Sequence, residues 1–153
     1  MKLILKFFHL FSLTVWFGSV TFLSMMAPVM FGNFPREQAG DVMGAIFPVF
    51  YMTGYIAGFI ALMTLILLNK KRVSVRVFLI MVMFLATLYG GLVAGKNADH
   101  LRQEIKHEQD SGRLTVLKDN FHKQHRLSMI SNAVILILIP VVLLFTARNL
   151  SES

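Results

Sequence analysis

Cysteine is missing from this sequence, and charged residues are scarce. The chain has 153 residues, of which 15% are charged and 56% are hydrophobic, and none is cysteine. Without cysteine, disulfides, thiolate catalysis and cysteine-ligated metal or iron–sulfur sites are excluded, so histidine and methionine are the nitrogen and sulfur ligands that remain. A soluble domain carries about 25% charged residues, so the low charge argues against a soluble protein.

Four long segments have almost no charge. Residues 46–69 contain no Lys, Arg, Asp or Glu, and the mean hydropathy of the chain is +0.65. A helix of about 20 apolar residues crosses the roughly 30 Å hydrocarbon core of a bilayer, and in a helix the backbone satisfies its own polar groups there. We therefore predict an all-α integral membrane protein, a four-helix bundle that forms one domain over residues 1–153. The predicted spans are residues 3–31, 46–69, 75–95 and 127–147.

The basic residues indicate a membrane protein rather than a nucleic-acid-binding one. The formal net charge is +7, but the basic residues cluster beside the spans, as membrane flanks do. The loop Lys70-Lys71-Arg72 has no acidic neighbour, which predicts that this loop and both termini are cytoplasmic. The start of the chain resembles a signal peptide, but it is too long and has no small-x-small cleavage site before Pro28, so we predict that it is a helix of the bundle. The lipid bilayer is the expected partner, while a homo-oligomer and a protein partner stay open.

Two connections have a predicted structure. Asn33-Phe34-Pro35 is typical of a helix start, and the amphipathic segment after it predicts an interfacial helix before span two. Pro48 should introduce a kink between this interfacial helix and span two. Residues 96–126 keep helical periodicity on both sides of Asp110-Ser111-Gly112. They predict an extramembrane antiparallel helical hairpin between spans three and four.

Polar residues are predicted to gather where this hairpin meets the membrane. If Gly112 is the tip of the hairpin, Lys96 lies level with Ser128 and Asp99 with His125. The spacing i, i+3, i+7 places His125, Ser128 and Asn132 on one helix face. This arrangement predicts a pocket, or alternatively hydrogen bonds that hold the helices together. The candidate pocket residues are Lys96, Asp99, His125, Ser128 and Asn132.

His9 is the single histidine inside a predicted span. It lies seven residues before Trp16, so the two rings share a helix face. It is a candidate axial ligand of haem or a metal, or alternatively a neutral histidine hydrogen-bonded to another helix. Because His9 and His125 enter the membrane from opposite faces, they should lie on the order of 20 Å or more apart. One porphyrin cannot use both.

Other chemistry has weaker support. His122 and His125 have a spacing that suits a metal, with Asp99 or His100 nearby, but this spacing is common and a solvated hairpin surface is the favoured explanation. Methionines near the end of span one suit copper transfer or, alternatively, packing. Spans two to four contain no acid or base that is expected to be buried, which argues against a proton pump or a charged ion filter. No catalytic triad, P-loop, dinucleotide fingerprint or carboxylate pair is visible, so the sequence favours a non-enzymatic protein.

Several motifs, taken in order, resemble the transmembrane protein 205-like family, which is built on a domain of unknown function. They are His9-Leu-Phe-Ser-Leu-Thr-Val-Trp16-Phe-Gly18, Ala27-Pro28-Val-Met-Phe31, Ala39-Gly40, Phe47-Pro48, Tyr51, and Phe121-His-Lys-Gln-His125-Arg126-Leu-Ser128-Met-Ile-Ser-Asn132. The resemblance implies a four-helix membrane protein without a settled activity. The opening His-x6-Trp-x-Gly is also similar, more distantly, to copper-resistance D proteins and the membrane protoporphyrinogen oxidase. That similarity implies His9 as a haem or copper ligand, although no cofactor is predicted otherwise.

These observations leave three functional expectations. The first is a multi-pass membrane protein that assists transport or tolerance of a small molecule or metal through the candidate pocket. The second is a haem- or metal-binding redox protein that uses His9. The third is a membrane scaffold that binds a partner through the hairpin of residues 96–126.

Overall fold

The protein is a bundle of long helices. The computed structural model describes residues 1–68 and 74–151, and within these residues all regular structure is helical. The predicted all-α membrane bundle is confirmed. The elements are α1 (Lys2–Asn33), α2 (Arg36–Leu68), α3 (Val75–Tyr89), the π-helix η1 (Gly90–Gly95), α4 (Lys96–His107) and α5 (Ser111–Ser151).

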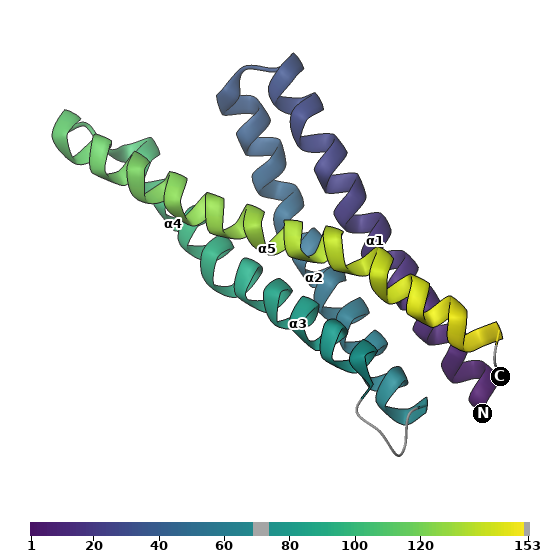
Figure 1. Cartoon of the computed structure of the whole chain (residues 1–153). Helices are drawn as coiled ribbons and strands as arrows, with labels where there is room; N and C mark the ends of the chain where they lie inside the picture. Colours follow the sequence, from purple (N-terminus) through teal and green to yellow (C-terminus); the bar gives the residue numbers. More distant parts are fainter. Residues whose placement is uncertain (69–73, 152–153) are drawn as a thin grey trace.

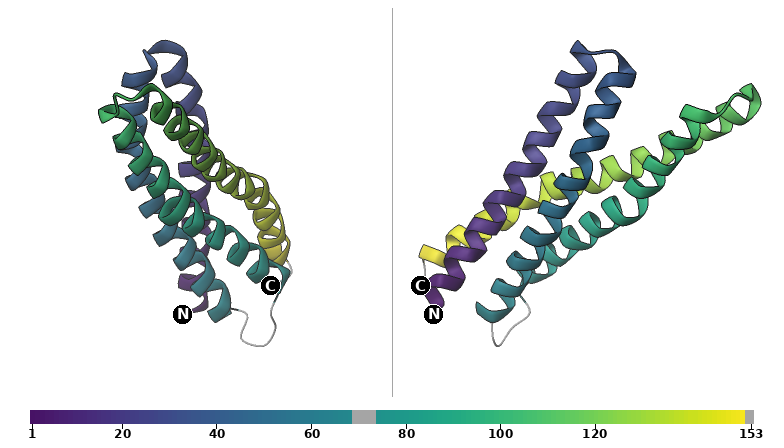
Figure 2. Two further views of the ribbon diagram at one scale, coloured as in Figure 1. Left: turned by 90° about the vertical axis from the view of Figure 1, so that its left-hand side faces the viewer. Right: turned by 180° about the vertical axis from the view of Figure 1, so that it is seen from behind.

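The helices form two antiparallel hairpins. One hairpin consists of α1 and α2, and the other consists of the continuous run α3–η1–α4 with α5 (Figure 1). Packing of α2 on α3 and of α1 on α5 joins the hairpins near the end that holds both termini. At the opposite end the hairpins diverge, as the views in Figures 1 and 2 both show. The bundle is therefore closed at one end and open at the other.

Four helical stretches are long and apolar enough to cross a membrane. They are Lys2–Asn33, Arg36–Leu68, Val75–His107 and Ser111–Arg148, and they contain the four predicted spans except Asn69, which lies outside the described residues. The loop Lys70-Lys71-Arg72, on which the predicted orientation depends, also lies outside them. Large apolar side chains are exposed along all four stretches, as expected for surfaces that contact lipid. This is a multi-pass membrane protein.

The segment before span two differs from its prediction in one respect. Residues 36–47 are helical as expected, but they continue without interruption into the apolar part of α2, with Pro48 inside the helix. A proline removes one backbone hydrogen bond, and neighbouring helices in a membrane bundle allow the helix to continue past it. The predicted interfacial helix is therefore the first three turns of α2 and not a separate element.

The predicted hairpin between spans three and four is present, with a different tip. The helix α4 ends at His107 and α5 begins at Ser111, so the turn lies before Gly112. The Asp110 carboxylate accepts a hydrogen bond of 2.8 Å from the Arg113 backbone N–H, which is how an N-cap residue acts. With Gly112 as the tip, Gly90 would lie level with Val134. A Cβ on Gly90 would instead lie 3.0 Å from the Cβ of Ser131, about one turn away.

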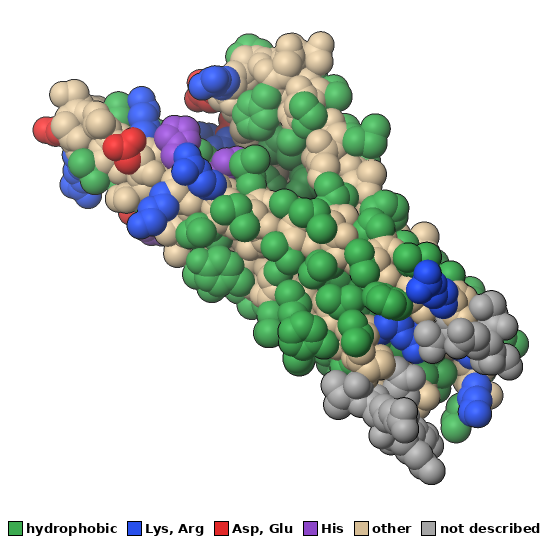
Figure 3. Space-filling model, viewed as in Figure 1, with side chains coloured by type: hydrophobic (Ala, Val, Ile, Leu, Met, Phe, Trp, Pro, Cys, Tyr) green, Lys and Arg blue, Asp and Glu red, His purple; other side chains and the backbone are tan. Residues whose placement is uncertain are grey.

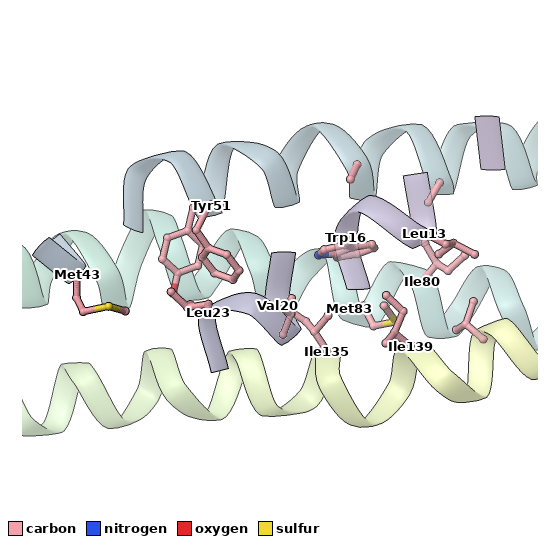
Figure 4. Packing of buried hydrophobic residues seen from close by; sticks show 14 of the residues in the cluster. Leu13, Trp16, Val20, Leu23, Met43, Tyr51, Ile80, Met83, Ile135 and Ile139 are labelled. Carbon is pink, nitrogen blue, oxygen red and sulfur yellow. The ribbon is translucent and has the colours of Figure 1, made fainter. Parts of the chain in front are cut away.

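The interior is apolar and tightly packed around one tryptophan. Trp16 of α1 has no exposed surface, and Figure 4 shows it beside Met83 and Ile139 in the middle of the bundle. Glycines on α2 let the two helices approach, because a Cβ on Gly58 would lie 3.0 Å from the Trp16 ring. Small residues allow helices to approach closely in membrane bundles. Such close packing matters there because lipid is itself apolar, so burial of apolar surface alone does not drive helices to associate.

Candidate functional site

Tyr51 links the two hairpins inside the bundle. Its side chain is 5% exposed, and its hydroxyl lies 2.6 Å from the hydroxyl oxygen of Ser128 on α5. A buried tyrosine needs a partner for its O–H group, above all where no water is available. The Tyr51–Ser128 hydrogen bond therefore fixes how α2 of one hairpin lies against α5 of the other.

The ring of Tyr51 lies against glycines of a neighbouring helix segment. A Cβ on Gly91 would lie 2.6 Å from Cγ of Tyr51, and a Cβ on Gly95 would lie 3.3 Å from its Cε2. Both glycines belong to η1, and the Lys96 N–H bonds the Gly91 carbonyl five residues earlier. Single π-helical turns are rare and occur often at functional sites. The glycine-rich π-helix provides the surface that the tyrosine ring needs.

Asn132 completes this polar group and has one atom without a partner. Asn132 follows Ser128 by about one turn on α5 and lies beside the Tyr51 hydroxyl. The Oδ1 atom of Asn132 is buried and makes no hydrogen bond within the described residues. The two ends of an amide are assigned from their surroundings, so in either orientation one polar atom of this amide is unpartnered. We call Tyr51, Ser128 and Asn132 the Tyr51 site.

The five predicted pocket residues do not all converge. Ser128 and Asn132 belong to the Tyr51 site, while Lys96 and Asp99 are exposed on α4. His125 is partly buried and stacks on Phe121, with ring centroids 5.7 Å apart and planes 7° apart. The earlier turn and the extra residue of the π-helix rotate α4 away from the predicted register, which explains why its polar residues face outward.

His9 is held between α1 and α2. Its ring is 2% exposed, and its Nδ1 lies 3.1 Å from the Ala61 carbonyl and 3.3 Å from the Thr64 hydroxyl. Bonding to a carbonyl places the proton on Nδ1, so Nε2 is left as an acceptor or ligand atom. The Nε2 atom is buried without a hydrogen-bond partner within the described residues.

The histidines and carboxylates form no evident metal centre. In the part of the chain that the structure describes, no three His, Asp or Glu side chains lie close enough together to hold one ion. His100 instead pairs with Glu104 one turn later, at 3.0 Å. Among the described residues, His122 and His125 therefore have no third side chain of these types close enough to complete a metal site.

A cluster of charged side chains joins the hairpins at their open end. The Oδ1 atom of Asp41 on α2 is paired with the Arg102 guanidinium and lies 2.7 Å from Nζ of Lys106, both on α4. The hydrogen bond from Lys106, together with the charges of Lys106 and Arg102, holds the pKa of Asp41 below its usual value. We call these three residues the inter-hairpin ion pair.

The surface is hollowed next to this ion pair. Figure 3 shows a notch between the end of α1 and α2 and the arm that α4 forms with the first part of α5, and basic and histidine side chains gather beside it. We define the notch by its two sides, Arg36–Gly44 and Arg102–His107. Tyr51 lies ten residues after Asp41 on the same helix, about three turns further into the bundle.

Sequence reasoning missed Tyr51 and Asp41 as site residues. The small-xxx-small spacings Gly54–Gly58 and Gly91–Gly95 were the available signal, because such pairs mark close helix contacts in membranes. No local pattern pairs Asp41 with residues 61 and 65 positions later. That contact depends on how the two hairpins are arranged in three dimensions.

Comparison with known proteins gives one match, which covers most of the first three spans. No curated protein and no solved structure matches the chain. A family model described as a domain of unknown function, DUF4149, matches residues 11–107, which is more than half of the sequence and includes Tyr51, the π-helix and the inter-hairpin ion pair. The match ends before Ser128 and begins after His9. The chain therefore belongs to the family of this domain of unknown function, DUF4149.

Proposed function

We propose that this protein binds a small polar molecule at the Tyr51 site and so assists its transport or the tolerance of it, without catalysing a reaction. The observation that carries the proposal is the unpartnered amide atom of Asn132 beside the Tyr51–Ser128 hydrogen bond. An unsatisfied polar group in an apolar interior costs about 1–3 kcal/mol. A ligand that bonds this amide recovers that free energy.

The side chains of the site favour one class of ligand. Tyr51, Ser128 and Asn132 are neutral hydrogen-bonding groups, and hydroxyls and amides bind neutral donors and acceptors better than they bind soft metal ions. We therefore infer a small neutral molecule with amide or hydroxyl groups, not a transition metal. The ligand would reach the Tyr51 site through the notch. If the termini are cytoplasmic, the notch faces the opposite side of the membrane.

The resemblance to the transmembrane protein 205-like family also supports this proposal. Its His-Arg-x-Ser-x-x-x-Asn run contains Ser128 and Asn132, the two residues of α5 that meet Tyr51. The run lies beyond the residues matched by the family model. A role in ligand binding would explain why these two polar residues occur within an apolar helix.

The test is ligand binding by the purified protein in lipid nanodiscs. Thermal unfolding is measured with increasing acetamide and glycerol, for the unmodified protein and for Asn132→Leu. Thr146→Val on the same helix is the matched control, since Thr146 is buried and, among the described residues, its hydroxyl bonds its own helix at the Val142 carbonyl. We expect a saturable rise in Tm for the unmodified protein and the control that Asn132→Leu lacks. Equal shifts in all three proteins, or none, would contradict the proposal.

A second candidate function is haem or metal binding at His9. It is favoured by the geometry of the ring, in which Nδ1 is fixed by the Ala61 carbonyl and Nε2 has no partner, the arrangement that orients many metal-ligating histidines. The distant resemblance to copper-resistance D proteins points to the same residue. The visible spectrum and metal content of the purified protein, beside His9→Ala and His125→Ala, decide it. A Soret band or stoichiometric metal that His9→Ala alone removes would support this function, and a colourless, metal-free protein would exclude it.

A further inference from the structure

The inter-hairpin ion pair has the properties of a reversible contact. Both basic residues share one oxygen of Asp41, and the Asp41 side chain is 51% exposed. Ion pairs with this exposure contribute little free energy and weaken further with salt. A contact of this strength can break and re-form without unfolding the protein.

Glycines on α2 accommodate the arginine of this pair. A Cβ on Gly40 would lie 3.2 Å from Nη2 of Arg102, and a Cβ on Gly44 would overlap Nη1. The Arg102 side chain is only 19% exposed, because it lies against this bare helix surface. The two glycines and Asp41 thus form a surface that fits one guanidinium. Two surface charges that met by chance would not need such a fit.

The segment that joins α4 to the membrane helix is able to change its geometry. The π-helix η1 has one more residue in its turn than an α-helix, and three of its six residues are glycine. Conversion of η1 to an α-helix would rotate α4 by about 100°. That rotation would carry Arg102 and Lys106 away from Asp41.

We propose that the inter-hairpin ion pair is a latch that holds α4 against α2 beside the notch, and that η1 is the hinge at which α4 rotates away from α2 when the latch opens. Opening gives access to the Tyr51 site from the notch. The role as an access gate rests on the proposed function, whereas the movement itself does not. No ligand is needed to detect the movement, so the latch and the binding site are tested separately.

The absence of cysteine makes the movement straightforward to measure. Gln38 and His107 are exposed on the two sides of the notch, and Gln38→Cys with His107→Cys would provide the two thiols of the chain for spin labels. Electron–electron distance measurements are made in lipid nanodiscs. We expect one narrow distance distribution with the latch intact, and a broader one at longer distance with Asp41→Asn.

Charge exchange separates the latch from a general loss of stability. The variant Asp41→Arg with Arg102→Asp is expected to return the distribution toward the original. Glu104→Gln is the matched control, because Glu104 lies on α4 and pairs with His100, not with α2. Its distribution should equal that of the unmodified protein. If Asp41→Asn leaves the distribution unchanged, or if the exchange fails to restore it in a folded protein, the latch is disproved.

A second readout reports on access to the site. In a protein with Ser128→Cys, a water-soluble maleimide should react slowly while the latch is intact. Addition of Asp41→Asn should raise the rate about two- to fivefold, the effect expected for loss of an exposed ion pair. An unchanged rate with a widened distance distribution would disprove the gate but keep the movement. Failure of every probe molecule to bind would disprove the proposed function and leave both latch measurements valid.

Discussion

Single polar side chains decide much of the behaviour of this protein, because its interior is otherwise apolar. Tyr51 is the most informative of them. Its hydroxyl is the donor or acceptor that joins α2 to α5, and its ring occupies the glycine surface of η1. Among the residues that the structure describes, His9 and Asn132 each have a buried polar atom without a hydrogen-bond partner. A residue of this kind costs stability unless something binds it.

Tyr51→Phe is expected to lower stability by about 1 kcal/mol, because the ring stays in place while the Ser128 hydroxyl loses its partner. Unfolding in mixed micelles measures the change. Tyr89→Phe is the control, since Tyr89 is 43% exposed, and it should be neutral. In the double variant Tyr51→Phe with Ser128→Ala the two losses should not add. Additive losses would show that the two hydroxyls are not coupled.

The inter-hairpin ion pair gives a defined pH dependence. The pKa of Asp41 is lowered in the folded protein, so its stabilising effect is complete above the unfolded pKa and disappears as the pH falls through the folded pKa. Arg102 and Lys106 face it from α4, and Arg36 and Glu37 lie on its own helix. The Tm difference between the unmodified protein and Asp41→Asn should be present at neutral pH and vanish in acid. A difference that grows in acid would contradict this assignment.

At the level of helices, the sequence predicted the existence of the elements better than their register. Apolar runs without charge fix the spans, and Asp110-Ser111-Gly112 was correctly expected to separate two helices. It was interpreted as the tip, although Asp110 caps the start of α5, as a residue of its type often does. The π-helix was not predicted, because the glycine-rich residues 90–95 have too few large side chains to reveal a change of helical phase. This extra residue is what turned Lys96 and Asp99 away from Ser128.

The glycines of η1 provide a matched test of packing. Gly91→Ala should strongly destabilise the protein or displace α4, since the new Cβ would overlap the Tyr55 hydroxyl and lie 2.6 Å from Cγ of Tyr51. Gly18→Ala on α1 meets nothing within 4 Å, so it should be neutral or stabilise by about 0.5–1 kcal/mol through helix propensity. Thermal unfolding of both variants checks this. Equal effects would mean that Tyr51 does not lie on η1.

At the level of the whole molecule, an even number of spans places both termini at one end of the bundle (Figures 1 and 2). The basic flanks predict that this end is cytoplasmic. A single thiol at Asp119→Cys, exposed on the far part of α5, should react with an impermeant maleimide in intact cells. One at Lys2→Cys should react only after the membrane is opened. The reverse pattern would invert the topology and place the notch in the cytoplasm.

The division into two hairpins also determines how the chain assembles. Lipid solvates apolar helix faces as well as other helices do, so apolar area alone gives the hairpins little tendency to associate. Before they meet, Tyr51 and Ser128 lack each other as partners and face hydrocarbon. Their mutual hydrogen bond therefore recruits the second hairpin to the first. The two hairpins thus behave like two different subunits joined in one polypeptide, and the groups of the proposed binding site are also the ones that bring the two hairpins together.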